Sequence, residues 1–425
     1  MQIKNQLLQI LNTNTLKESS ITGVATIVNG VLGVIFYITV ARVLGPAGFG
    51  IFAVVIAALT LIAGIANLGT DTGLIRFIGK YRLVDRIKAL KFLKLGVEIK
   101  IIAWIVILVV GWFLVPFLSR QVFLKDEFTS PLKIALLGIG GVLLFSFATS
   151  GLQAYQKYFS WSLVNIGSNS LRLLVLLGLL LMGNLSLNSS LLTYALIPFA
   201  GFIVALALLP KFIFVKRETA VAAEFFHYNK WVALFIVIAA VSSRLDIFLV
   251  ARFLPSISVG IYSAANQLTA VVPQLVFAIA TVVAPKLAGF TNHTDATAYL
   301  KKLQFLVLGI AGLGLLLLPF ALYLIPLLFG QLYQQSVGVF VILFFAQLIF
   351  LVSLPFHQAI FYYFAKPSVF VIVSVVHLFI ISAFGWFLIP SYGVYGGAIT
   401  VLLGSISNFI LPAIWVVRQF KKHYK

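Results

Sequence analysis

Hydrophobic runs alternate with short polar stretches along almost the whole chain. Each run is about 20 residues long, which is the length that a helix needs to cross the hydrocarbon core of a bilayer. The polar stretches are connections rather than domains, and the longest are residues 77–94, 216–230 and 290–302. The pattern predicts an all-α, polytopic membrane protein with about twelve transmembrane helices, near residues 21–43, 48–70, 95–117, 132–153, 162–183, 191–214, 231–254, 260–285, 303–328, 337–361, 369–389 and 396–417.

The composition agrees with this pattern. Hydrophobic residues make up 62% of the 425 positions and charged residues 9%, whereas about 25% of residues are charged in a soluble protein. The absence of cysteine excludes disulfides, thiol catalysis and cysteine-ligated metal centres. A net charge of +20 would suggest nucleic acid as the partner of a soluble protein, but membrane proteins collect lysine and arginine on their cytoplasmic side. We therefore expect neither a nucleic-acid partner nor a cofactor.

The basic residues indicate the orientation in the membrane. With twelve helices both termini lie on one side, and that side carries most of the lysines and arginines, in clusters at residues 76–94, 211–230 and 418–425. The positive-inside bias therefore places both termini in the cytoplasm. The opposite face carries few basic residues: Arg42, Arg120, Lys125, Lys133 and Arg252.

One phrase occurs twice in the chain. V-A-R-V-L-G-P-A-G-F-G-I-F at residues 40–52 returns 210 positions later as V-A-R-F-L-P-S-I-S-V-G-I-Y at residues 250–262. L-V-P-F-L at 114–118 and L-I-P-L-L at 324–328 are separated by the same offset. Both pairs fall at equivalent points of a six-helix unit, which indicates a duplication with parallel repeats. We expect two pseudo-symmetric six-helix bundles, residues 1–215 and 231–425, joined by a cytoplasmic linker at 216–230 and facing a central cavity.

Ionisable residues inside the predicted helices are candidates for function, because charges are costly in a bilayer. Arg172 lies near the middle of its helix, Arg244 lies past the bilayer centre, and Arg42 and Arg252 occupy equivalent outer positions. Arginines could bind an anionic substrate through charge-assisted hydrogen bonds. Snorkelling or interhelical ion pairs are the alternative, equally favoured for Arg42 and Arg252 and less favoured for Arg172 and Arg244.

Asp246 is the acidic residue among these candidates. On a continuous helix, residues two apart point about 200° from each other, so Asp246 is not expected to pair with Arg244. It requires a partner on another helix, a proton or a cation. Asp246 is therefore either a structural counter-ion or the site that couples transport to an ion.

Other ionisable residues are weaker candidates. Asp71, Glu98 and Lys100 lie near the predicted interface, where we expect ordinary solvation. His357 and His377 are expected to be hydrogen-bonded structural imidazoles rather than a proton relay. Residues 73–80, G-L-I-R-F-I-G-K, do not match the spacing of a phosphate loop. We expect no ATP hydrolysis and a driving force from the membrane potential or from a proton or sodium gradient.

Several segments resemble a known family. A-R-V-L-G-P-A-G-F-G, R-L-D-I-F-L-V-A-R-F-L, V-G-I-Y-S-A-A-N-Q-L, I-P-L-L-F-G-Q-L-Y and Y-G-V-Y-G-G-A-I are similar to motifs of bacterial polysaccharide and O-antigen flippases. These proteins belong to the multidrug/oligosaccharidyl-lipid/polysaccharide (MOP) exporter superfamily. One departure is Pro255-Ser256, which stands where the first copy of the phrase has Gly45-Pro46.

The resemblance implies a function and a set of partners. It implies a MATE-like fold in the bacterial inner membrane that flips undecaprenyl-diphosphate-linked oligosaccharides from the cytoplasmic to the periplasmic leaflet by alternating access. The expected partners are this lipid-linked substrate, membrane lipids, a coupling proton or sodium ion, and a polysaccharide polymerase. We do not expect an enzyme.

Two other functions are less favoured. A multidrug or cation antiporter of the same superfamily would be expected to have acidic cavity residues, whereas arginine outnumbers aspartate in these helices. A membrane polymerase or ligase would be expected to have a large outer loop, whereas every outer connection is short.

Overall fold

The computed structural model describes residues 14–423 except 291 and 367, and its regular secondary structure is entirely helical. Nine apolar runs among these residues are long enough to cross a membrane. Two of them, Ile21–Asn67 and Ser368–Lys421, are 47 and 54 residues long. Each is interrupted by a glycine with positive φ, Gly45 at 65° and Gly393 at 59°. Each therefore contains two of the predicted helices, and the all-α, polytopic prediction is confirmed.

The chain divides into two compact units. The first contains residues 1–43 and 55–240, and the second contains residues 44–54 and 241–425. The helices begin and end as follows: α2 Asn14–Asn67, α3 Thr70–Tyr81, α4 Arg86–Phe117, α5 Thr129–Ala154, α6 Tyr158–Leu181, α7 Leu187–Leu208, α8 Thr219–Ser242, α9 Leu245–Phe253, α10 Ser256–Thr269, α11 Val271–Ala288, α12 His293–Leu317, α13 Ala321–Phe329, α14 Ser336–Gln358 and α15 Ser368–His423.

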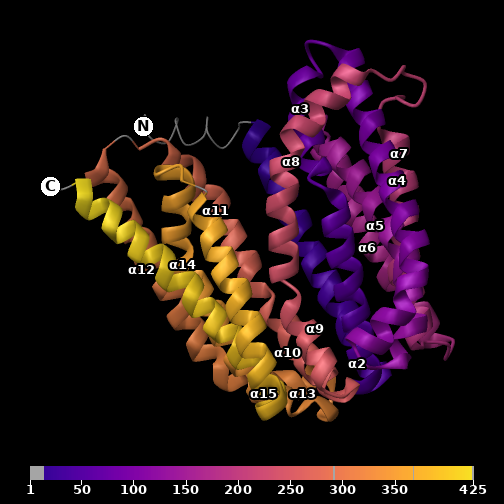
Figure 1. Ribbon diagram of the computed structural model, residues 1–425, viewed down its shortest axis with the longest axis vertical. Coiled ribbons are helices and arrows are strands. Elements are labelled where there is room, and N and C mark those ends of the chain that lie inside the picture. The colour runs from indigo at the N-terminus through magenta and orange to yellow at the C-terminus, as the bar shows by residue number, and fades with distance from the viewer. Residues whose placement is uncertain (1–13, 291, 367, 424–425) are drawn as a thin grey trace. The chain divides into compact units, whose positions relative to one another are not determined.

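Helix α5 is the centre of the first unit and packs against α3, α4, α6 and α7 (Figure 1). Small residues allow the close approach of α7, since a Cβ on Gly141 would lie 2.8 Å from the backbone oxygen of Ala195. A buried aromatic cluster closes one end of this unit, with the rings of Phe77 and Phe92 stacked at 4.7 Å and Phe225 of α8 beside them. The start of α8 thus packs into the core of the first unit.

Helix α14 has the same central place in the second unit, where it packs against α10, α11, α12 and α15 (Figure 1). Both α5 and α14 are the fourth membrane crossing of their half of the sequence. The repeat extends to backbone conformation, because Gly183 and Gly393 are 210 positions apart and both have positive φ, at 70° and 59°. The two units therefore share an internal architecture, as the duplicated sequence predicts.

The repeated phrase contains two glycines that meet in the second unit. A Cβ on Gly50 would overlap the backbone oxygen of Ser256, and a Cβ on Gly260 would overlap the backbone oxygen of Pro46. Gly50 and Gly260 are equivalent positions of the two copies. The phrase repeats a glycine there because two backbones approach each other reciprocally, leaving no room for a side chain.

Several predicted helices are interrupted or begin earlier than expected, and two breaks lie next to candidate charged residues. The helix predicted at 231–254 begins at Thr219 as α8, ends at Ser242, and resumes as α9 at Leu245. The helix predicted at 48–70 is followed by two residues with positive φ, Leu68 at 48° and Gly69 at 72°, before α3 continues the chain. Both breaks fall in short polar stretches, S-S-R-L-D at 242–246 and N-L-G-T-D-T-G at 67–73, which hydropathy averaged over a whole span does not resolve.

Candidate functional site

Asp246 is held by a tyrosine in the second unit. It lies in the first turn of α9, and its Oδ2 accepts a hydrogen bond of 2.6 Å from the hydroxyl of Tyr262 on α10. Tyr262 is completely buried, whereas Asp246 is half-buried. None of the ion pairs among the described residues includes Asp246. A protein hydroxyl therefore supplies the partner that the sequence required on another helix.

A line of polar groups joins α15 to α14. Nδ1 of His377 lies 3.1 Å from the backbone oxygen of Gly404 and 3.0 Å from Nδ2 of Asn408. The backbone oxygen of Asn408 then lies 2.9 Å from Nε2 of His357. Both imidazoles have hydrogen-bonding neighbours within the second unit.

The protonation state of His377 decides which of its two Nδ1 contacts is a hydrogen bond. With a proton on Nδ1 the ring donates to the Gly404 oxygen, and without it the ring accepts from the Asn408 amide. One nitrogen cannot satisfy both neighbours at once. The arrangement can therefore exchange one hydrogen bond for another when a proton arrives or leaves.

The acid and its tyrosine occur in one copy of the repeat. At the 210-residue offset, Asp246 corresponds to Phe36 and Tyr262 corresponds to Phe52. Both phenylalanines are completely buried. The two copies therefore differ chemically at this point, and only the second places a carboxylate there.

In the first unit the position equivalent to Asp246 contacts a cation. The guanidinium carbon of Arg172 on α6 lies 5.3 Å from the ring centre of Phe36 and 4.6 Å from that of Tyr194 on α7. Nη2 of Arg172 also donates a hydrogen bond to Oδ1 of Asn169, whose Nδ2 donates to Oδ1 of Asn29 at 2.7 Å. Arg172 is half-buried, and cation–π contacts and one amide hold its guanidinium in place.

The other predicted arginines have different surroundings. Arg42 is exposed on α2. Arg252 lies on α9 with its guanidinium carbon 5.5 Å from the ring centre of Trp386. Arg244 precedes the first residue of α9 with φ −130°, between α8 and α9. The prediction that Arg244 and Asp246 lie on one continuous helix is therefore wrong, because the chain leaves helical geometry at Arg244.

The expectation of ordinary solvation at Lys100 is also wrong. The side chain of Lys100 is completely buried. Its Nζ lies 2.9 Å from Oδ1 of Asp71 and donates hydrogen bonds to Oδ1 of Asn67 at 2.8 Å and to Oγ of Ser146 at 3.1 Å. Asp71 reaches this place because α2 ends at Asn67 and α3 starts three residues later. Opposite charges near the same ends of adjacent predicted helices were the available signal for this pair.

Within the described residues, no group of three or more histidine, cysteine, aspartate or glutamate side chains could hold a metal ion. Among the charged residues singled out by the sequence, the Arg172 guanidinium in the first unit and the Asp246 carboxylate with Tyr262 in the second are held by neighbouring side chains. The first can bind an anion, and the second can take up a proton or a cation.

Comparison with known proteins identifies a family and similar folds. A family described as "Polysaccharide biosynthesis protein" matches residues 15–290. The comparison with curated proteins returns no match.

Solved structures are similar in fold. The inward-facing form of a multidrug resistance MATE family transporter of the MOP superfamily has a TM-score of 0.77 at 13% identity, covering 93% of this chain and 95% of the other. The lipid II flippase MurJ in an inward closed conformation has a TM-score of 0.74 at 14% identity, covering 94% and 89%. A MOP superfamily transporter from Pyrococcus furiosus has a TM-score of 0.62 at 15% identity, covering 96% and 94%.

Proposed function

This chain belongs to the polysaccharide biosynthesis protein family, and from that premise we propose that it is a flippase for undecaprenyl-diphosphate-linked oligosaccharides. It has the fold of membrane transporters of the MOP superfamily. The proposed reaction moves the lipid-linked unit from the cytoplasmic to the periplasmic leaflet of the bacterial inner membrane by alternating access. Both termini are proposed to be cytoplasmic, and a polysaccharide polymerase is the proposed recipient of the flipped unit.

The observation that supports this proposal is the guanidinium of Arg172, which cation–π contacts and a hydrogen bond hold in place. A diphosphate is an anion that must cross a slab of low dielectric, and a positioned arginine can bind it through charge-assisted hydrogen bonds. The cation–π contacts with Phe36 and Tyr194 orient the guanidinium before any substrate arrives. We assign Arg172 as the first substrate-binding residue, with Arg42, Arg244 and Arg252 as further contacts along the path.

Asp246 is the proposed ion-coupling residue, with a proton or sodium as the ion. A proton is the better match to its surroundings, because the carboxylate accepts a hydrogen bond from the Tyr262 hydroxyl, and a protonated carboxyl could donate to that hydroxyl instead. Protonation would neutralise Asp246 and remove a negative charge from the second unit. The two halves of the repeat would then have separate tasks, with anion binding in the first and ion binding in the second.

The second candidate function is a multidrug or cation antiporter, and Asp246 is the observation that favours it. A cationic substrate could bind a half-buried carboxylate. The same substrate would be repelled by the guanidinium of Arg172. The flippase therefore remains the better match to the charged residues of the two units.

Reconstitution in liposomes tests the proposal. The assay follows how fast a fluorescent polyprenyl-diphosphate oligosaccharide becomes accessible to a membrane-impermeant quencher. We expect faster exchange than in empty liposomes, a loss of roughly tenfold or more in Arg172→Ala, and partial activity in Arg172→Lys. Arg120→Ala is the matched control, since Arg120 is exposed and pairs with Asp126 at 2.7 Å. Equal rates in Arg172→Ala and wild type would contradict the assignment of the substrate site.

Asp246→Asn separates coupling from substrate binding. We expect this variant to lose the acceleration produced by an imposed proton gradient while it still binds the lipid-linked oligosaccharide. Gradient-driven movement of a cationic dye without any movement of the oligosaccharide would support the antiporter instead. Unchanged acceleration in Asp246→Asn would remove Asp246 from the coupling mechanism.

A further inference from the structure

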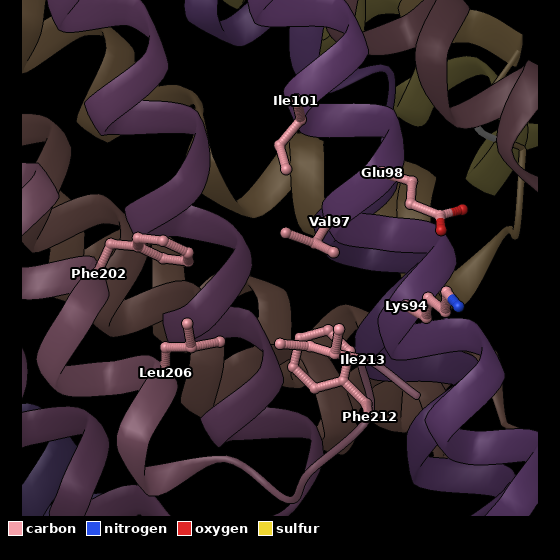
Figure 2. A pocket seen from close by; sticks show the side chains of 8 residues that line it. All are labelled: Lys94, Val97, Glu98, Ile101, Phe202, Leu206, Phe212 and Ile213. Carbon is pink, nitrogen blue, oxygen red and sulfur yellow. The ribbon is translucent and has the colours of Figure 1, made fainter. Parts of the chain in front are cut away.

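A groove lies on the first unit between α4 and α7, and none of the residues assigned to transport lines it. Its volume is about 280 Å³. Figure 2 shows Val97 and Ile101 of α4 across from Phe202 and Leu206 of α7, with Phe212 and Ile213 of the following segment at its end. Both helices pack against α5. The groove is thus an apolar channel between two helices that share a common support.

The helices that form the groove present apolar faces to their surroundings. Ile102, Ile105 and Val109 of α4 are 61%, 51% and 55% exposed, and Ile203 of α7 is 66% exposed. In a membrane-spanning protein such surfaces contact lipid chains rather than water. The groove is therefore continuous with the surface that meets the acyl chains of the bilayer.

Charged residues lie along the α4 edge of the groove (Figure 2). Nζ of Lys94 donates to the backbone oxygen of Val215 at 2.7 Å, and Nε of Arg217 pairs with Oε1 of Glu98 at 2.9 Å. The charged ends of Lys94 and Glu98 lie at the α4 edge (Figure 2). Residues 91–98 and 211–218 together contain five basic and two acidic side chains, an excess of three positive charges.

The two basic residues at this edge retain hydrogen-bonding capacity. An ammonium has three N–H donors and a guanidinium has five. Among the described residues, Lys94 has one hydrogen-bond acceptor and Arg217 has one carboxylate partner. The side chain of Arg217 is 77% exposed. Donors are therefore available for a phosphate beside the mouth of an apolar channel.

We propose that the groove between α4 and α7 binds an anionic phospholipid, with an acyl chain along Val97, Phe202 and Leu206 and the phosphate at Lys94 and Arg217. The excess of positive charge selects an anionic headgroup over a zwitterionic one. The volume lies at the lower limit of roughly 300–1,000 Å³ for ligand pockets, which suits one acyl chain rather than a bulky ligand. The bound phosphate joins α4 to the connection between α7 and α8.

Native mass spectrometry of the purified full chain tests this site, with phosphatidylglycerol and phosphatidylcholine of identical acyl chains as probes. We expect wild type to bind phosphatidylglycerol about tenfold more tightly than phosphatidylcholine, as one to two charge-assisted hydrogen bonds would produce. Lys94→Ala with Arg217→Ala should abolish this preference. Equal affinity of wild type for the two lipids would overturn the proposal.

Two matched controls separate the groove from general surface effects. Lys157 also donates from Nζ to a backbone oxygen, that of Leu208 at 2.7 Å, but does not line the groove, so Lys157→Ala should keep the preference. Leu206→Trp fills the groove and should weaken binding of both lipids, whereas Ile203→Trp on the exposed face of α7 should not. Far-ultraviolet circular dichroism confirms that each variant is folded.

Competition identifies the occupant. Undecaprenyl phosphate should displace phosphatidylglycerol no better than a second phosphatidylglycerol of different mass. Displacement at a tenfold lower concentration would assign the groove to the lipid carrier and overturn the phospholipid proposal. A loss of preference in Lys157→Ala as large as that in the Lys94 and Arg217 variant would also overturn it.

Discussion

Single residues distinguish the two copies of the repeat. The second copy has an aspartate and a tyrosine at the positions where the first has Phe36 and Phe52, and the tyrosine hydroxyl satisfies the acid at 2.6 Å. The first copy places Arg172 against Phe36 instead. A carboxylate thus occupies this position in the second copy, whereas in the first copy the equivalent phenylalanine contacts a guanidinium from another helix. A duplication maintains the geometry, while a few substitutions create chemical differences between the halves.

The buried pair of Lys100 and Asp71 leads to a prediction on stability. Lys100→Met should lower the free energy of unfolding by about 3–5 kcal/mol, because it leaves the Asp71 carboxylate without its cation. Lys100→Met combined with Asp71→Asn should recover most of this loss. Denaturant unfolding in detergent micelles measures both. Additive losses in the double variant would contradict a direct pairing of the two charges.

The reciprocal glycines of the repeated phrase lead to a second prediction. Gly50→Ala places a methyl group into the backbone of Ser256 and Gly260, which cannot yield as a flexible side chain can. We expect a loss of about 1–3 kcal/mol from overpacking. Gly33→Ala, in the part of α2 before the break at Gly45, is the control, since a Cβ there meets nothing within 4 Å. The two variants should shift the unfolding temperature in opposite directions. Gly50→Ala should lower it, and Gly33→Ala should raise it, because alanine at an open helical position is stabilising.

At the scale of elements, helix breaks position the charged groups. The interruption after Asn67 turns the chain so that Asp71 reaches Lys100, and the turn at Ser243 and Arg244 separates α8 from α9. The first turn of α9 then carries Asp246. Both breaks fall in short polar stretches between longer apolar segments. Each break is followed within a few residues by a charged side chain described above, Asp71 after the first break and Asp246 after the second.

A polar cluster connects the start of α8 to α3 and α4, and it predicts that the stability of the fold depends on pH. Oε2 of Glu224 lies 2.8 Å from Nζ of Lys88, and Oε1 accepts from the hydroxyl of Tyr81 at 2.9 Å. The hydrogen bond from Lys88 lowers the pKa of Glu224 below its usual value. A carboxyl with a lowered folded-state pKa stabilises the fold above its unfolded pKa of about 4.3, and this contribution disappears as the pH falls through the folded value.

Glu224→Gln measures this contribution. The variant should be less stable than wild type by about 1 kcal/mol or less at pH 7, because the Glu224 side chain is 31% exposed. The difference should shrink as the pH falls from 5 to 3. Glu218→Gln, which removes the partner of Lys91 at a side chain that is 45% exposed, should show a smaller difference. A difference for Glu224→Gln that grows on acidification would contradict the assigned direction of the pKa.

At the scale of the whole molecule, two units repeat one architecture around α5 and α14. The unit boundaries do not follow the midpoint of the sequence, since residues 44–54 belong to the second unit and α8 belongs largely to the first. The repeated phrase explains why residues 44–54 belong to the second unit. Gly50 packs against the backbone of Ser256, and Gly260 packs against the backbone of Pro46.

The topology of the whole chain is testable because it contains no cysteine. Asn188→Cys lies at an exposed position in the predicted periplasmic connection, and Lys216→Cys lies at an exposed position in the predicted cytoplasmic one. A membrane-impermeant maleimide should label Asn188→Cys in intact spheroplasts and Lys216→Cys only after permeabilisation. The cysteine-free parent is the background control. The reverse pattern would invert the proposed orientation.

The sequence by itself determined the membrane class, the helical fold and the duplication. These follow from local properties, namely the length of apolar runs, their spacing and a recurring phrase. It also singled out Arg172 and Asp246, because an ionisable residue in an apolar run is visible without any knowledge of its neighbours.

Only the tertiary structure decided the partners. Tyr262 beside Asp246, Asp71 beside Lys100, and the aromatic rings beside Arg172 come from other helices, whose packing the sequence does not state. The helix breaks were hidden for a related reason, since hydrophobicity reports burial in lipid and not the backbone angles of two residues. Pairing and backbone conformation depend on what packs against each segment, and a linear pattern does not contain that information.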